Sequence, residues 1–339
     1  MKKSILFSIF GFAVMGVLFG QVPYKSKYPD IPIVDVHVHI YKEADATNYL
    51  KVSEAIKKKY GSNLAYFIGF FEPRNEPVTL ADVKLAGKNR FIYAVSEMAP
   101  HKGLTHTPEE VVAMVREGYV GLKFWFGDPR RVIKEGEDGI TRIDNPAYEE
   151  LFSTLERNNV LMTSLHIADP NGPFDSRQNW MKDPVYYWRQ IRAFENVVAK
   201  YPNLTIVAAH GAWIICQDAQ LDYLRYMLSK YPNLYIDISA TYQYIPLMNY
   251  ENLRDFYIEY QDRILYGSDF SAFSDDGIQR IADRYSSHFA ILETDQIITG
   301  ASNNGELKGL NLPREVLEKI YYKNALRLYP GLKKTMGIK

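Results

Sequence analysis

The stretch Ile33–Ile40, IVDVHVHI, alternates strand-forming residues with one aspartate and two histidines. Side chains at positions i and i+2 of a β-strand point to the same face. His37 and His39 therefore share one face, and the alternation assigns Asp35 to that face and the valines to the other. A single buried histidine is most often an ordinary core residue. Two on one strand face favour a metal site, although short motifs of this kind also arise by chance.

Composition restricts the class of protein. The chain has 339 residues, which is enough for one large α/β domain. Its 40 basic residues balance 40 acidic ones, so it has no positive excess of the kind that nucleic-acid binding requires. We expect a small-molecule substrate and no nucleic-acid partner. The sequence leaves open whether the chain forms a homo-oligomer.

The N-terminal residues predict export. A short basic start precedes the uncharged apolar run Ile5–Gly20, which is the layout of a secretory signal peptide. The run is slightly short for a membrane-spanning helix. We expect residues 1–20 to be cleaved, leaving residues 21–339 in the periplasm or outside the cell without a stable membrane anchor. Cleavage after Gly20 would place Leu18 at the third residue before the cut, where a small residue is preferred. The exact cleavage site therefore stays open.

Beyond residue 30, short apolar segments alternate with helical patterns. Thr107-Pro108 with Glu110 forms a capping box, and Gly118 is a stop signal for that helix. Asn145-Pro146 and Asp183-Pro184 open two more helices. The predicted strands are Ile33–His39, Ala65–Phe70, Phe91–Val95, Tyr119–Phe124, Val160–His166, Leu204–His210, Leu234–Ser239 and Ile264–Asp269.

Eight strand–helix units predict an α/β fold of the (β/α)8 barrel class, formed as one domain by residues 21–339. A doubly wound open sheet is the alternative. No glycine-rich phosphate loop follows the first predicted strand, which disfavours that alternative.

Chemically active residues fall on several of the predicted strands. The fourth carries Lys123, and the fifth, sixth and eighth end at His166, His210 and Asp269. In a barrel these C-terminal ends meet at one rim, where active sites lie. Taken alone, each residue has an ordinary structural explanation: Lys123 as a solvent-facing lysine, His166 as a core histidine and Asp269 as a helix cap. Their joint occurrence with the first-strand histidines favours a single site.

Imidazoles with one carboxylate suit zinc, and also iron, manganese or nickel. Such an ion lowers the pKa of a bound water from 15.7 to about 7. A neighbouring aspartate can take up the released proton and pass it to a leaving group.

These motifs resemble the amidohydrolase superfamily, and more closely its amidohydrolase-related members typified by aminocarboxymuconate-semialdehyde decarboxylase. The resemblance rests on VDVHVH, VAAHG, ILYGSDF and VLEKIYYKNALRLY, and covers roughly residues 30–330. It implies that one divalent metal, zinc above all, is held by four residues: His37, His39, His166 and Asp269. It implies that Asp269 and His210 are catalytic.

The resemblance leaves the metal count open. In two-metal members of the superfamily a carboxylated lysine on the fourth strand bridges the ions, which is the position of Lys123, and His210 binds the second ion. We favour one metal, with Lys123 contacting an anionic substrate group or supporting the site.

Two enzymatic functions and one non-enzymatic function compete. The first is a secreted metal-dependent hydrolase that uses an activated water on a C–O or C–N bond of a small ester, lactone or amide. The alternative is a metal-dependent decarboxylase or hydratase of an aromatic-derived carboxylic acid. A binding protein that merely kept the barrel is disfavoured by the intact ligand set. Predicted loops also carry candidate substrate contacts, namely Arg130, Arg131, Arg177, Trp125, Trp180 and Trp213.

Overall fold

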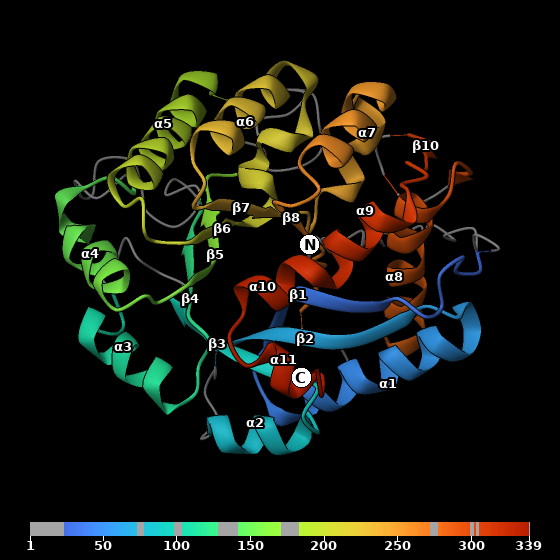
Figure 1. The fold of residues 1–339 in the computed structure, drawn as a ribbon, viewed down its shortest axis with the longest axis horizontal. Helices are drawn as coiled ribbons and strands as arrows, with labels where there is room; N and C mark the ends of the chain where they lie inside the picture. Colours follow the sequence, from blue (N-terminus) through green and yellow to red (C-terminus); the bar gives the residue numbers. More distant parts are fainter. Residues whose placement is uncertain are drawn as a thin grey trace, which may run out of the picture.

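The computed structural model describes residues 24–72, 78–97, 104–127, 142–170, 183–271, 277–298, 302 and 305–338. Eight parallel strands, in the order β1 to β8, form a barrel that helices surround (Figure 1). This confirms the predicted (β/α)8 architecture. The strands are β1 Pro32–Ile40, β2 Asn63–Phe71, β3 Phe91–Glu97, β4 Leu122–Phe126, β5 Met162–Ile167, β6 Ile206–Ala208, β7 Leu234–Asp237 and β8 Ile264–Leu265.

The barrel closes between β8 and β1. Val38 and Phe270 form a parallel bridge, and the backbone N–H of Asp269 donates to the carbonyl of His37 at 2.9 Å. The N–H of His39 donates to the carbonyl of Phe270 at 3.1 Å. Closure therefore places the aspartate of the last strand beside both histidines of the first.

The helices begin where capping residues predicted them. Thr107 accepts from the N–H of Glu110 at the start of α3, and Gly118 ends that helix with φ +116°. Asp183 caps α5, whereas Asn145 caps a short 3₁₀ turn that precedes α4. The helices are α1 Glu43–Tyr60, α2 Leu80–Ala86, α3 Pro108–Glu117, α4 Glu149–Arg157, α5 Pro184–Lys200, α6 Asp218–Lys230, α7 Tyr250–Glu259, α8 Ile278–Glu293, α9 Arg314–Glu318, α10 Asn324–Leu328 and α11 Leu332–Thr335.

A bulge in β1 corrects the predicted facing of its residues. The register with β2 shifts between Asp35 and Val38, so strict alternation is lost there. Val36 joins the apolar cluster that fills the barrel, while Asp35 points outward and accepts from Tyr285 of α8 at 2.6 Å. Asp35 is thus not on the face of His37, which shares the inner face with His39 as predicted.

Three strands end earlier than predicted. β7 stops at Asp237, and β6 and β8 stop at Ala208 and Leu265, before His210 and Asp269. These two residues have φ values of +58° and +63°, which lie in the left-handed region, so the chain turns away from the ladder there. Both side chains therefore sit on the turns that follow the strands.

The end of the barrel opposite these turns is closed by the C-terminal helices. Ala325, Tyr329 and Leu332 join Val34 and Val120 in the apolar cluster that fills the barrel interior. No helix in the described part of the chain is long and apolar enough to span a membrane. The predicted signal peptide at residues 1–20 lies outside the described residues, as do four of the loop candidates: Arg130, Arg131, Arg177 and Trp180.

Candidate metal centre

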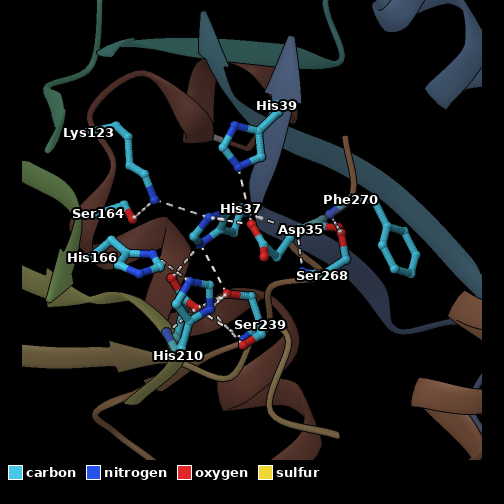
Figure 2. Close-up of polar contacts among 12 residues, drawn as sticks. Asp35, His37, His39, Lys123, Ser164, His166, His210, Ser239, Ser268 and Phe270 are labelled. Atoms are coloured by element: carbon cyan, nitrogen blue, oxygen red, sulfur yellow. Dashed lines mark hydrogen bonds and ion pairs between the residues drawn. The ribbon is translucent and has the colours of Figure 1, made fainter. Parts of the chain in front are cut away.

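Side chains from several strand ends point toward one another inside the mouth of the barrel (Figure 2). The Oδ1 atom of Asp269 lies 3.2 Å from Nε2 of His37 and 3.1 Å from Nε2 of His39. One possible ligand atom from each of His37, His210 and Asp269 lies within 4.8 Å of the others. The barrel thus brings together residues that are up to 232 positions apart in sequence, since 269 − 37 = 232.

His166 and His210 form a second close pair. Nδ1 of His166 lies 3.1 Å from Nε2 of His210. The outer nitrogens lie near carbonyl oxygens, Nε2 of His166 at 3.0 Å from Ala168 and Nδ1 of His210 at 2.9 Å from Ser239. Carbonyls only accept, so we assign the ring protons to these outer nitrogens. The two inner nitrogens then face each other with lone pairs.

A cation fits this arrangement better than a proton does. Burial lowers the pKa of His210 to about 3, and burial also lowers the pKa of His166. Both rings are therefore neutral near pH 7. Their two facing lone pairs then repel each other unless a positive ion lies between or beside them. The donor set of imidazole nitrogens and one carboxylate suits a divalent transition metal.

Asp237 and Ser239 orient the ring of His37. Oδ2 of Asp237 lies 2.9 Å from Nδ1 of His37, and the hydroxyl of Ser239 lies 3.0 Å from the same atom. This leaves Nε2 of His37 facing Asp269, the arrangement by which outer carboxylates orient metal-ligating histidines. Burial opposes ionisation of Asp237, but contact with His37 outweighs it and holds the pKa far below its usual range.

Sequence reasoning missed Asp237 and Ser239, although the signal was present. They lie two apart at the end of the seventh predicted strand, in YIDIS. This is the same spacing that singled out His37 and His39. The sequence does not reveal which strand ends lie opposite each other. It therefore did not predict that the carboxylate of Asp237 would hold the ring of His37, a candidate metal ligand, from the side away from the metal.

Asp269 is held as an anion. Burial alone would raise its pKa, but hydrogen bonds with His37 and His39 lower it well below the ordinary value. Lys123 projects from β4 toward the same place, with Nζ 3.3 Å from Nε2 of His37 and 3.0 Å from the hydroxyl of Ser164. Burial lowers the pKa of Lys123 to about 8. A buried cation therefore lies beside the histidines.

Left-handed backbone gathers around the site. Ala168, His210, Ala240 and Asp269 each have φ between +56° and +63°, and each lies within four residues after the end of a strand. Such a conformation costs roughly 1–2 kcal/mol for a residue with a side chain. The surrounding barrel enforces it, and the turns aim His210 and Asp269 back into the mouth.

Aromatic rings wall the site. Trp213 stacks on His210 with ring centroids 4.3 Å apart, and Trp125 lies 5.5 Å from His166. Phe70 meets His37 edge-on at 4.7 Å. A pocket of about 440 Å³ borders Asp269. A larger cavity of about 960 Å³ lies at the opposite end of the barrel, where no candidate metal ligand is present among its lining residues.

Known proteins share this fold and part of this sequence. The amidohydrolase family model matches residues 101–331, which is more than half of the chain. No curated protein sequence matches the chain. Among solved structures, an uncharacterized TIM-barrel protein from Bordetella bronchiseptica is 17% identical, with 90% of this chain and 99% of that chain covered and a TM-score of 0.51.

Two further structures are similar at lower scores. A 5-carboxyvanillate decarboxylase from Novosphingobium aromaticivorans, complexed with manganese, is 13% identical over 91% of this chain and 99% of that chain, with a TM-score of 0.47. An amidohydrolase from Burkholderia multivorans with bound zinc is 12% identical over 88% and 99%, with a TM-score of 0.46.

The Bordetella likeness supports the barrel, and the family match covers β4 to β8 with the residues His166, His210 and Asp269. The chain belongs to the amidohydrolase family and is a metal-dependent enzyme of the amidohydrolase superfamily built on a (β/α)8 barrel.

Proposed function

We propose that this enzyme is an exported hydrolase that uses one zinc ion and an activated water to cleave a C–O or C–N bond of a small ester, lactone or amide. The observation that carries the proposal is the convergence of possible ligand atoms: two imidazole nitrogens lie within 3.2 Å of one oxygen of Asp269. His37, His39, His166 and Asp269 would hold the ion. When bound, the ion lowers the pKa of a water and polarises the scissile carbonyl.

The chain's own residues supply the remaining chemistry. Asp237 fixes the ring of His37 through Nδ1, and the Ser239 carbonyl fixes His210 through the same ring position. The second oxygen of Asp269 is available to take a proton from the attacking water and return it to the leaving group. His210, neutral because burial lowers its pKa to about 3, can accept a proton at Nε2 as charge develops.

Aromatic rings and one buried cation surround the proposed reacting region. Phe70 and Trp213 pack on His37 and His210, which excludes bulk water from the inner side of the histidines. Lys123 adds a buried positive charge that suits an oxyanion or a carboxylate.

The decisive experiment begins with metal analysis of the purified protein. We expect about one divalent ion per chain, loss of activity after chelation and recovery with zinc. The metal-loaded protein is then assayed against lactones, esters, amides and carboxylated aromatics, with carbon dioxide measured in parallel. Hydrolysis without carbon dioxide supports the proposal. Carbon dioxide release from a carboxylated aromatic, without hydrolysis, replaces it with the decarboxylase alternative.

A further inference from the structure

A pocket of about 440 Å³ opens beside the candidate metal centre. Its lining includes Asp269 and Phe270, which follow β8, and Arg280 and Arg284 of α8. Gln243, from the 3₁₀ segment that follows β7, also lines the pocket. In Figure 1, α8 lies on the outside of the barrel near β1. The pocket therefore borders both Asp269 of the candidate metal centre and helix α8.

The two arginines present their charges on one side of α8. They are four positions apart, so they are neighbours on the helix surface. The guanidinium of Arg284 lies 4.4 Å from the ring centroid of Phe270, the residue next to Asp269. This contact holds the guanidinium of Arg284 over the residue that follows Asp269.

Neither charge is neutralised within the described part of the chain. No ion pair joins Arg280 or Arg284 to a described carboxylate. The acidic residue between them, Asp283, is engaged on the other side, where it accepts from Lys59 at 3.0 Å and from Tyr60. Most exposed arginines are simply solvated, but two that line one pocket, with no described carboxylate as partner, suit the recognition of an anion.

The charge of Arg284 interacts with those of Arg280 and Asp269. Burial lowers the pKa of Arg284, the neighbouring Arg280 lowers it further, and Asp269 opposes both effects. The guanidinium nevertheless stays charged near pH 7. An anion bound between the arginines would relieve their mutual repulsion while its other end reached toward Asp269.

The rest of the wall suits a flat or apolar body. Tyr242 stacks on His288 with ring centroids 3.7 Å apart, and Phe270 lies 5.4 Å from the same imidazole. The hydroxyl-bearing residues Ser287 and Ser302 also line the pocket. An aromatic or short apolar acid therefore finds both a ring surface and hydrogen-bonding groups.

We propose that Arg280 and Arg284 form a carboxylate subsite, so that the substrate is an acid whose carboxylate binds at α8 while its scissile bond lies at Asp269. This rests on the proposed hydrolase function and narrows its substrate class to ester, lactone or amide derivatives that carry a free carboxylate. Arg130, Arg131 and Arg177, the arginines that the sequence offered, are not needed for it.

The test measures binding of benzoate and of its uncharged isostere benzamide to zinc-loaded protein by titration calorimetry. We expect benzoate to bind more tightly than benzamide, and R280Q and R284Q each to weaken benzoate binding roughly tenfold or more. R284K, which keeps the charge but loses the planar fork, should fall between wild type and R284Q. R116Q removes an exposed charge on α3 and should leave benzoate binding unchanged.

Each outcome decides the subsite independently of turnover. Wild-type protein that does not prefer benzoate, or R280Q and R284Q that both retain wild-type affinity, overturns the subsite even if the enzyme hydrolyses a neutral ester. Arginine-dependent benzoate binding supports it even if no hydrolysis is detected, in which case only the hydrolase function fails. Zinc content and far-UV circular dichroism of each variant identify a folding defect. If R284Q does not fold, R280Q still tests the subsite.

Discussion

At the scale of single residues, the metal centre depends on the two histidines of β1. We predict that His37→Ala and His39→Ala each lose bound metal and most activity, because each removes a nitrogen that lies within 3.2 Å of Asp269. Metal per chain, measured by mass spectrometry on purified variants, checks this. His106→Ala, which removes a histidine that binds Glu97 instead, is the matched control. Full metal occupancy in both β1 variants would contradict the assignment.

Lys123 decides the metal count. As a free ammonium it repels a second divalent ion, whereas a carboxylated lysine would attract one. Its Nζ lies 3.3 Å from His37 and 3.0 Å from the Ser164 hydroxyl, and its lowered pKa of about 8 leaves it mostly charged at pH 7. We predict one metal per chain, retained in Lys123→Ala. A ratio near two that falls to one or none in the variant would overturn this, and His210 would then be a second-metal ligand.

At the scale of the elements, the start of β4 tolerates no side chain. Gly121 has φ +151°, and a Cβ there would lie 2.2 Å from the backbone oxygen of Leu161 in the neighbouring strand segment. We predict that Gly121→Ala lowers the free energy of unfolding by about 2 kcal/mol or more, because backbone cannot move aside as a side chain can. Urea denaturation checks this.

Gly118→Ala is the matched comparison. This glycine also has a positive φ, +116°, but its added Cβ would meet only the flexible end of Lys84 at 2.9 Å. We expect a smaller loss there, about 1 kcal/mol, from the backbone conformation alone. Equal losses at the two glycines would show that the contact with Leu161 is not the cause.

The contact between the end of α8 and the N-terminal segment predicts that the stability of the folded protein depends on pH. Glu293 accepts from Ser26, from the N–H of Lys27 and from Tyr321 at 3.0 to 3.1 Å, and burial raises the pKa of its carboxyl. The folded state therefore holds this proton more tightly than the unfolded chain, whose glutamate pKa is about 4.3. The resulting stability is present below that value and is lost as the pH rises through the folded pKa.

Glu293→Gln isolates this effect because it removes the titrating group. We predict that the free energy of unfolding of the wild-type protein falls relative to that of the variant as the pH rises from about 4 to 7. Chemical denaturation at several pH values measures the difference. A difference that stays constant or grows with pH would contradict the raised pKa.

At the scale of the whole molecule, the N-terminal sequence predicts processing on export. We expect protein recovered outside the cytoplasm to lack residues 1–20, because a basic start and the apolar run Ile5–Gly20 form a signal peptide. Intact-mass measurement of the exported fraction checks this. Recovery of the uncleaved chain in membranes would favour an anchor instead.

The barrel and most of its rim were predictable because their signals are local. Capping residues such as Thr107 and Asp183 start helices by bonding to the next few N–H groups, and that pattern is written in adjacent positions. Alternating apolar segments mark strands in the same way. Eight such units have few ways to bury their apolar faces, so fold class follows from the pattern.

The sequence by itself determined the (β/α)8 class and the candidate residues at or just beyond its strand ends: His37, His39, His166, His210 and Asp269. Only the tertiary structure decided that Asp35 faces α8, because the bulge in β1 reflects pairing with β2 and not local propensity. It also decided that Asp237 lies behind His37, and that Arg284 of the helix layer packs on Phe270, the residue that follows Asp269. These partners lie up to 250 positions apart, since 285 − 35 = 250 separates Asp35 from Tyr285, and such contacts exist only once barrel closure brings β8 and its helix against β1.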